Sequence, residues 1–545
     1  MPQTQRARSG CSEVDRECQG RRTRPVPHRS AWRAHQLARA RRRSLEAAIE
    51  ANDPQLPLQP ADPTRTIKRL FGAAPREDVI HVLVKVPRHV APPPAKRRKL
   101  LTDLKREIAT PSSFSKTKHG NSYSWVRVVP QCKAQIECHR IDWGDEDATA
   151  LPVVLLNEVF ARFDANCKSI ELTVWDTPFA LELCRKLSTP FRNEAELPAK
   201  SRELLNEYLF EYLPDCSILP ISLAHATSDG SYFCNSKLLL NVEFRRGRGE
   251  GDGDPTMQNI AYYIHVLPDR VDCQIPSFVL DICGPLLGVS GIVNLSDEKL
   301  VCDPLSLKFP VILFDNDDML VGLARLCASL KFAVRELRKF ISCNAVTLKP
   351  PIDQLEFPYK NSYEKDDIVT TFRYNKRIQR FTFEAQTESG LQVIVKLSRT
   401  YSKEVHEYCA NAGVAPTLLH YEVLVNGWIF VVMEKLEAVL LAEVLGTGTV
   451  TKSTLESKVR RIQRLLRPQN YVHGDLRESN LMWEESRNEL KMIDFDWAGK
   501  DGEAFYPPFL NTEVKWPGGV APGKVLIAAH DDYWLNLLLR EASQY

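Results

Sequence analysis

The sequence predicts an α+β protein made of several domains, and three observations lead to that prediction. Its 545 residues are enough for two to four domains that each bury a core. Hydrophobic residues make up 43% of the chain and charged residues 26%, as in proteins that fold in water. Apolar runs typical of strands and segments of helical periodicity both recur from residue 148 onward.

The composition argues against a membrane protein and against a disulfide-bonded one. The most apolar stretch, residues 278–295, contains Asp281 and glycine breaks, so no membrane span is expected. The 14 cysteines form no C-x-x-C pair, which favours reduced thiols inside a cell. The first 30 residues lack an apolar core with a cleavage site, so the sequence shows no secretion route.

Residues 1–60 are predicted to be a basic disordered tail. Residues 1–50 hold twelve arginines, no lysine and five acids, with few large apolar residues between them. Such a segment is ordinarily a solvated tail, and contact with nucleic acid or another acidic surface is the alternative.

Residues 61–90 predict the end of a small α+β unit. A short amphipathic turn at residues 67–71 precedes a strand at residues 79–84. The sequence HVLVKVP, residues 81–87, resembles the strand that closes the ubiquitin-like N-terminal domain of Crinkler effectors. We therefore interpret this stretch as a truncated ubiquitin-like domain, and the resemblance implies a secreted effector that acts in a host cell.

Residues 91–145 are predicted to be a linker that carries a nuclear localisation signal. Three prolines keep the chain extended in front of four consecutive cations, which are Lys96, Arg97, Arg98 and Lys99. Cations on an extended, solvated segment fit the groove of a nuclear import receptor, so the sequence predicts a location in a nucleus.

Residues 146–350 are predicted to form an α/β domain. Periodicity typical of helices covers residues 153–163 and 202–213, and residues 237–244 read as a strand. Asp254 followed by proline then gives the signal for the start of another helix.

A set of polar residues follows the order of these elements. It comprises Asp229, Glu243, Arg245, Gln258 and Tyr262. The layout resembles that of PD-(D/E)xK nucleases of the restriction-endonuclease-like fold, in which carboxylates hold Mg²⁺ and a lysine assists the attacking water. Arg245 stands at the lysine position and cannot act as a base, so the resemblance implies a degenerate nuclease site that contacts DNA. A surface hairpin with a solvated loop is the alternative.

Residues 355–545 are predicted to begin with an antiparallel sheet. Residues 369–372 and 379–385 read as strands, and we expect a turn at residues 373–377 between them. No G-x-G-x-x-G is present, so this Asn/Lys/Arg turn is expected to replace a glycine-rich phosphate loop.

The next strand ends at Lys396, and a helix over residues 402–412 follows it. A lysine at this place before a helix is typical of one that holds nucleotide phosphates, and Glu404 is its expected ion-pair partner. A buried strand then ends at Met433, with Glu434 and Leu436 just after it.

The most informative stretch is residues 471–499, which contains H-G-D, then Asn480, then an apolar run that ends in Asp494. Phosphoryl transfer from a Mg-nucleotide needs one carboxylate to orient the acceptor and take its proton. It also needs an amide and a second carboxylate to hold the metal. Asp475, Asn480 and Asp494 follow this order with a hairpin between the last two.

These residues resemble the catalytic core of the protein-kinase-like superfamily, and Gly474 brings the motif closer to aminoglycoside-kinase-like enzymes. The resemblance implies a bilobal fold with a shortened C-terminal lobe, and it implies ATP and Mg²⁺ as cofactors. It also implies that Met433 backs an adenine pocket and that Glu434 and Leu436 lie in the hinge, whose backbone binds the adenine. Asp496 stands where the usual motif has glycine. Asp532 resembles the helix aspartate that braces the catalytic loop.

The leading hypothesis is a Crinkler-like effector whose Mg-ATP-dependent kinase, most simply a protein Ser/Thr kinase, acts in a nucleus. Two alternatives stay open. One is a pseudokinase fused to a DNA-binding or DNA-cleaving module, and the other is a small-molecule kinase. The expected partners are a nucleotide, a protein substrate, the import receptor and DNA, with no membrane.

Overall fold

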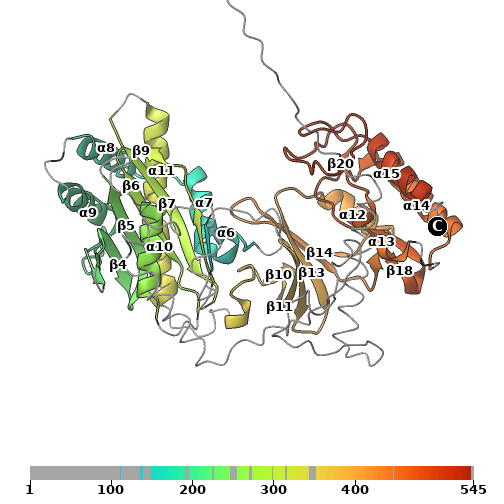
Figure 1. Ribbon diagram of the computed structural model, residues 1–545, viewed down its shortest axis with the longest axis horizontal. Coiled ribbons are helices and arrows are strands. Elements are labelled where there is room, and N and C mark those ends of the chain that lie inside the picture. The colour runs from blue at the N-terminus through green and yellow to red at the C-terminus, as the bar shows by residue number, and fades with distance from the viewer. Residues whose placement is uncertain are drawn as a thin grey trace, which may run out of the picture. The chain divides into compact units, whose positions relative to one another are not determined.

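The structure of the chain is a computed structural model. The ubiquitin-like stretch at residues 61–90 and the cations Lys96–Lys99 lie outside the residues that the structure describes. The described residues are 111, 135–138, 149–189, 191, 195–223, 226–245, 254–268, 273–296, 299–313, 316–342, 351–445, 447 and 449–541. Within them the fold is mixed α+β with several separate sheets (Figure 1).

The first large element is a mixed seven-stranded sheet in the order β1-β8-β7-β6-β5-β4, with β9 paired to β7. Its strands are β1 (Gln135–Cys138), β4 (Gly230–Cys234), β5 (Lys237–Arg245), β6 (Ser277–Cys283), β7 (Leu286–Asn294), β8 (Lys299–Pro304) and β9 (Phe309–Pro310). β5 and β6 run parallel and the helix between them is the crossover, whereas β4–β5 and β6–β7 are antiparallel. β1 falls in residues predicted to be linker, so that part of the linker prediction is wrong.

Helices cover both faces of this sheet. α10 packs over β5 and β6 on one face, and the layer of α7 and α11 packs on the other (Figure 1). The helices are α6 (Val153–Leu156), α7 (Glu158–Ser169), α8 (Asp176–Leu187), α9 (Glu196–Leu209), α10 (Pro255–Val266) and α11 (Asp317–Ser342). The side chain of Asp254 caps α10 at the predicted residue. The helix predicted at residues 202–213 begins earlier, at Glu196, and ends at Leu209.

The second large element is a six-stranded antiparallel sheet in the order β10-β11-β12-β13-β15-β14. Its strands are β10 (Ser362–Lys365), β11 (Ile368–Gln379), β12 (Thr382–Thr387), β13 (Gln392–Ser398), β14 (Leu418–Val423) and β15 (Ile429–Glu434). Helix α12 (Lys403–Asn411) follows β13, with the side chain of Ser402 as its cap. This order places β13, which carries Lys396, in the middle of the sheet.

The turn predicted at residues 373–377 is wrong, because β11 continues through these residues to Gln379. Phe372 and Tyr374 are buried on one face of the strand, while Arg373 and Lys376 are exposed. The connection to β12 is at residues 380–381. Thr382 pairs in register with Lys396, so this tight turn lies at the lysine end of the sheet.

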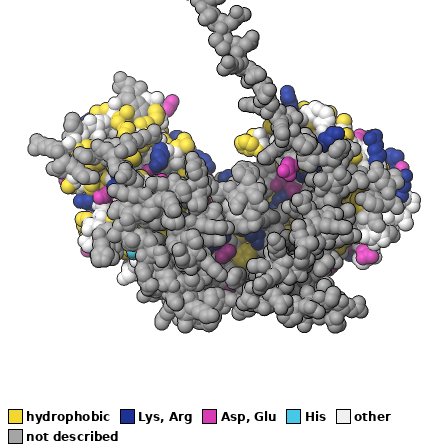
Figure 2. Space-filling view, viewed as in Figure 1, with side chains coloured by type: hydrophobic (Ala, Val, Ile, Leu, Met, Phe, Trp, Pro, Cys, Tyr) yellow, Lys and Arg dark blue, Asp and Glu magenta, His cyan; other side chains and the backbone are white. Residues whose placement is uncertain are grey.

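The remaining chain builds a helical region with short strand pairs. It contains β16 (Val439–Leu440), α13 (Leu441–Val444), α14 (Lys452–Leu466), β17 (Tyr471–Val472), β18 (Leu481–Glu484), β19 (Glu489–Met492), β20 (Gly499–Lys500) and α15 (Ala528–Glu541). α14 buries one apolar side and carries Lys and Arg side chains on the other, where Figure 2 shows blue patches. Among the described residues, no helix is long and apolar enough to cross a membrane.

Candidate active site

Lys396 is the centre of a buried charge cluster. Its Nζ lies 2.6 Å from Asp494 Oδ1 and 2.7 Å from Asp496 Oδ1. Burial alone would lower the pKa of the lysine, but the two carboxylates outweigh it, and the pKa is raised. Lys396 is therefore a cation held by two acids that lie about a hundred residues further along the chain.

The expected ion pair between Lys396 and Glu404 is not formed. Glu404 accepts a hydrogen bond from the Tyr471 hydroxyl at 2.6 Å and lies 3.4 Å from Lys500, with its side chain 65% exposed. Helical phase explains the error, because α12 buries Val405 and Cys409, one turn apart. Glu404 then falls on the side of the helix that turns to solvent.

Asp475 and Asn480 lie in contact, as their spacing in the sequence suggested. Asn480 Nδ2 donates to the carboxylate Oδ2 of Asp475 and to its backbone oxygen, both at 2.9 Å. Arg477, which the sequence interpretation overlooked, donates to the same carboxylate from Nε at 2.5 Å and from a second nitrogen at 2.7 Å. The carboxylate is thus fixed from two sides.

The loop around Asp475 is held by an aspartate of α15. Asp531, not the predicted Asp532, accepts the backbone N–H groups of His473 at 2.6 Å and Gly474 at 2.9 Å. Asp531 shares its helix face with buried Leu535, one turn on, whereas Asp532 points to Gln463 on α14. Burial raises the pKa of Asp531 to about 7.

Asp494 occupies an uncommon backbone conformation, with φ of 72° in the left-handed region. Such strain marks functional positions when the surroundings fix it. Here the next residue, Phe495, is buried between the rings of His473, at 5.1 Å, and His406, at 4.6 Å. His473 also contacts the backbone oxygen of Ile493 at 3.1 Å. The packed rings therefore hold Asp494 against Lys396.

The two aspartates differ in their electrostatics. Burial would raise the pKa of Asp494, but Lys396 overcomes it and the pKa is lowered. For Asp496, burial prevails over Lys396 and the charge of Asp494 adds to it, so its pKa rises to about 6. Asp494 is consequently the more firmly ionised of the two, which suits a metal ligand.

His406 makes stability depend on pH. Burial lowers its pKa from 6.5 to about 4, and its ring nitrogens contact Tyr401 and the Pro416 backbone oxygen. The folded state holds the neutral ring, so its stability is complete above pH 6.5 and is lost as the pH falls towards 4. We expect a loss of about 3 kcal/mol across that window.

Denaturant unfolding of wild type and His406→Gln between pH 4 and 7.5 measures this contribution. The difference in free energy of unfolding between the two proteins should shrink as the pH falls, because wild type loses the contribution of His406. The other histidines are the same in both proteins and cancel. A difference that does not change with pH would contradict the assignment.

Met433, the residue expected to back the adenine, shares a sheet face with Lys396. Met433 is buried and pairs in register with Ile394, two residues before the lysine on β13. Side chains two apart on a strand point the same way, so Met433 and Lys396 are on one face. Glu434 ends β15, and half-buried Leu436 follows it in the connection to β16.

The oxygen atoms that Asn480 and Asp494 have available for coordination fit a magnesium nucleotide. Nδ2 of Asn480 is used by Asp475, so its Oδ1 is the atom left for a cation. The backbone links Asn480 to the Asp494 segment, since Ile493 N donates to Asn480 O at 3.0 Å. An amide oxygen and an ionised carboxylate suit Mg²⁺. In the part of the chain that the structure describes, no three His, Cys, Asp or Glu residues form a metal cluster.

A second polar cluster lies at the ends of β5 and β6. Glu243 and Asp281 are register partners on these parallel strands. Glu243 is fully buried, and its carboxylate oxygens form no hydrogen bond of normal geometry with a described residue; the Asp229 backbone and the Asn241 side chain interact with it only weakly. Burial first and Asp229 second raise its pKa well above the usual range. A buried acid without a donor is costly unless a ligand compensates it.

The other predicted residues of this cluster surround Glu243. Arg245 donates to Gln258 on α10, and Asp229 accepts the Phe244 backbone N–H at 2.9 Å. The pKa of Tyr262 on α10 is raised by burial and then by Glu243. The sequence interpretation overlooked Asp281 and its partner Lys308, whose Nζ contacts Asp281 Oδ2.

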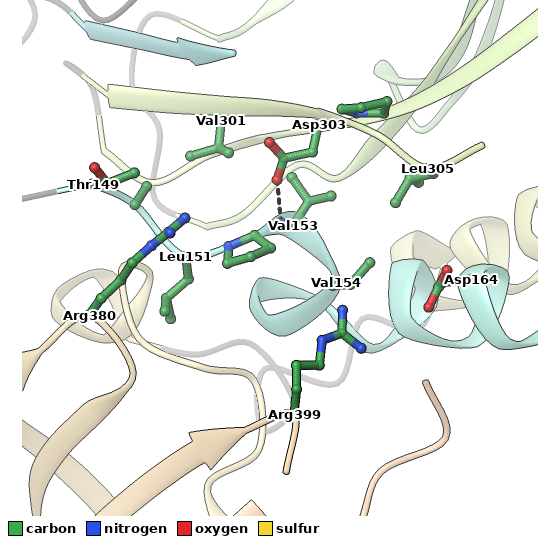
Figure 3. A pocket seen from close by; sticks show the side chains of 13 residues that line it. Thr149, Leu151, Val153, Val154, Asp164, Val301, Asp303, Leu305, Arg380 and Arg399 are labelled. Atoms are coloured by element: carbon green, nitrogen blue, oxygen red, sulfur yellow. Dashed lines mark hydrogen bonds between the residues drawn. The ribbon is translucent and has the colours of Figure 1, made fainter. Parts of the chain in front are cut away.

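A separate pocket of about 370 Å³ contains two arginines, Arg380 and Arg399, and residues 149–154 (Figure 3). Asp303 on its wall accepts the backbone N–H of Val153 at 2.8 Å. None of the predicted site residues lines this pocket, so it belongs to neither cluster.

Comparison with known proteins adds one structural likeness. No family model and no curated protein matches the chain. Among solved structures, the kinase PK-1 of Cydia pomonella granulovirus is similar over 31% of this chain and 67% of its own. The sequence identity is 15% and the TM-score 0.27. A likeness of this size does not establish a fold, so the interpretation of the site depends on the contacts described above.

Proposed function

We propose that the C-terminal part of the chain is a Mg-ATP-dependent phosphotransferase, most simply a protein Ser/Thr kinase. The proposal depends on one observation. Lys396 contacts Asp494, Asn480 contacts Asp475, and a backbone hydrogen bond from Ile493 to Asn480 joins the two pairs. These are a phosphate-binding cation, two metal ligands and a base, the groups that phosphoryl transfer needs.

Each residue has a role that follows from its contacts. Asp475, held by Arg477 and Asn480, would orient the acceptor hydroxyl and take its proton. Lys396 would hold the nucleotide phosphates, and Met433 would back the adenine. Asn480 and Asp494 would hold Mg²⁺, which when bound neutralises charge on the phosphates. Buried His473 and Phe495 keep these loops in place and exclude water.

Turnover of radiolabelled ATP by the purified full chain tests the proposal. We expect label on the protein, or on an added acceptor, that requires Mg²⁺ and disappears with EDTA. Casein-like proteins, aminoglycosides and sugars as acceptors would separate a protein kinase from a small-molecule kinase. Nucleotide that raises the melting temperature without any transfer would instead point to a pseudokinase.

A second candidate function concerns residues 146–350. We propose that Glu243 and Asp281 bind a divalent cation for binding or cleaving DNA. The orphaned Glu243 carboxylate beside a second acid favours this proposal, and Lys308 supplies the lysine that Arg245 does not. Gly288 faces this pair: an added Cβ would lie 3.2 Å from Asp281 Oδ1 and 3.3 Å from Lys308 Cε. The glycine leaves room for the lysine to reach over the sheet.

Glu243→Gln should remove cation binding while the fold persists, because glutamine keeps the shape of the side chain and loses its charge. The measurement is the rise in melting temperature with Mn²⁺ or Mg²⁺, together with Mg²⁺-dependent nicking of a plasmid. We expect the rise in wild type and in the control Glu207→Gln, whose side chain is exposed on α9, and not in Glu243→Gln. An equal response in all three proteins would reject the site.

Delivery by a Crinkler-type ubiquitin-like domain and entry into a nucleus through Lys96–Lys99 stay proposals from the sequence. The described residues carry neither segment. They concern where the protein acts, and the chemistry proposed above does not depend on them.

A further inference from the structure

Helix α12 offers no acid to Lys396. The buried side chains of this helix are Val405, His406 and Cys409. Glu404 is engaged with Tyr471 and Lys500, and Glu407 is an exposed partner of Lys403 at 3.7 Å. A lysine that binds phosphates needs a fixed carboxylate to hold its long, flexible side chain. That carboxylate must come from elsewhere.

Asp496 has the contacts of such a carboxylate. Its Oδ1 lies 2.7 Å from Lys396 Nζ, and its Oδ2 forms a 2.8 Å hydrogen bond with the Ser398 hydroxyl. Lys396 and Ser398 are two residues apart on β13, so both side chains point to the same face of the sheet. β13 therefore contacts both oxygens of the carboxylate, Oδ1 through the ion pair with Lys396 and Oδ2 through Ser398.

Asp494 cannot fill this role in the nucleotide complex. It also contacts Lys396, at 2.6 Å, but it is the proposed ligand of Mg²⁺. When Asp494 coordinates the metal ion, Asp496 is the one remaining acid, among the described residues, within ion-pair distance of Lys396.

We propose that Asp496 is the positioning residue for Lys396, in place of a glutamate on the neighbouring helix. The inference depends on the proposed phosphotransferase function. This role explains why an aspartate follows Phe495: at position 496, each oxygen of a carboxylate contacts a residue of β13. It also means that the lysine is positioned by β13 and the 494–496 segment, so a movement of α12 is not needed to assemble the pair.

Two matched variants test the proposal, Asp496→Asn and Glu404→Gln. Each replaces one carboxylate with the amide of the same shape. We expect Asp496→Asn to raise the KM for ATP and lower kcat/KM by about 10- to 100-fold, as for the loss of one preorganised polar group. Glu404→Gln should stay within about twofold of wild type, since its side chain is exposed and makes no contact with Lys396. The reverse order of effects would overturn the proposal.

A double-mutant cycle shows whether Asp496 acts through Lys396. In a Lys396→Ala background, Asp496→Asn should cause no further loss, because the side chain to be positioned is gone. Independent, multiplicative losses would mean that Asp496 acts on its own. Asp496→Gly is a second check. We expect it to lose as much activity as Asp496→Asn, because it also lacks the carboxylate. Activity like that of wild type would mean that the position only needs a small residue.

Mg-nucleotide binding separates failure of this inference from failure of the proposed function. Binding is read by titration calorimetry on the same proteins. If wild type binds Mg-ATP but transfers no phosphate, the kinase proposal fails, and weaker binding by Asp496→Asn than by Glu404→Gln still supports the positioning role. If wild type neither binds nor transfers, both proposals are overturned.

Discussion

Asp475→Asn should lower the rate of phosphoryl transfer by about 10³-fold, within the range for losing a general base. Asparagine keeps the size of the side chain, but it cannot take the acceptor proton. It can also accept from Arg477 with only one oxygen, so the bidentate pair at 2.5 and 2.7 Å is lost. The loss should appear in kcat, because the acceptor proton moves only during the reaction.

The initial rate of radiolabelled phosphate transfer by the full chain measures this effect. The melting temperature of Asp475→Asn should stay close to that of wild type, since Asp531 still anchors the loop through the His473 and Gly474 backbone. Undiminished transfer by the variant, with contaminating kinases excluded, would show that Asp475 is not the base.

Gly474→Ala should destabilise the same loop by about 2–4 kcal/mol, the sum of a left-handed backbone and an overpacked contact. Gly474 has φ of 84°, and an added Cβ would overlap Leu526 Cδ2. Leu526 is fully buried with Val472 and Tyr506, so it has little space to move. The shifted loop should also reduce phosphoryl transfer, because Asp475 is the next residue.

Gly390→Ala is the matched control for this prediction. Gly390 also has a left-handed φ, 87°, but an added Cβ there meets nothing within 4 Å. It should cost only the backbone term, about 1 kcal/mol, and leave transfer unchanged. Denaturant unfolding compares the two variants, and Gly474→Ala combined with Leu526→Ala should lose less stability than the sum of the two single losses, because the shorter side chain removes the overlap. Equal effects at both glycines would reject the steric explanation.

Local sequence signals predicted most of the elements near the site. Asp254 and Ser402 cap the helices that they were expected to start, and the hairpin expected between Asn480 and Asp494 is formed by β18 and β19. These predictions are correct because the hydrogen bonds of a helix cap or a turn join residues only a few positions apart in the sequence. The contact of Asp475 with Asn480 is equally local, since they are five residues apart in one loop.

Two errors share a different cause. Glu404 was expected on Lys396, and Asp532 was expected under the catalytic loop. In each case the choice depends on which side of a helix or strand faces the core. That side is decided by partners far along the chain, as for Leu535 beside Asp531. A helix with acids at adjacent positions does not reveal its phase by itself.

The residue types available for phosphoryl transfer, and their order, can be read directly from the chain, because that chemistry requires a lysine, an amide and two aspartates at characteristic spacings. Their pairing cannot be read in this way and depends on the tertiary fold. The fold placed Asp496 and Ser398 beside Lys396, Asp281 beside Glu243 in register, and Lys308 on Asp281. A buried charge pairs with an opposite charge that packing brings close to it. Packing joins strands and loops that are distant in sequence, so the sequence order does not show the partner.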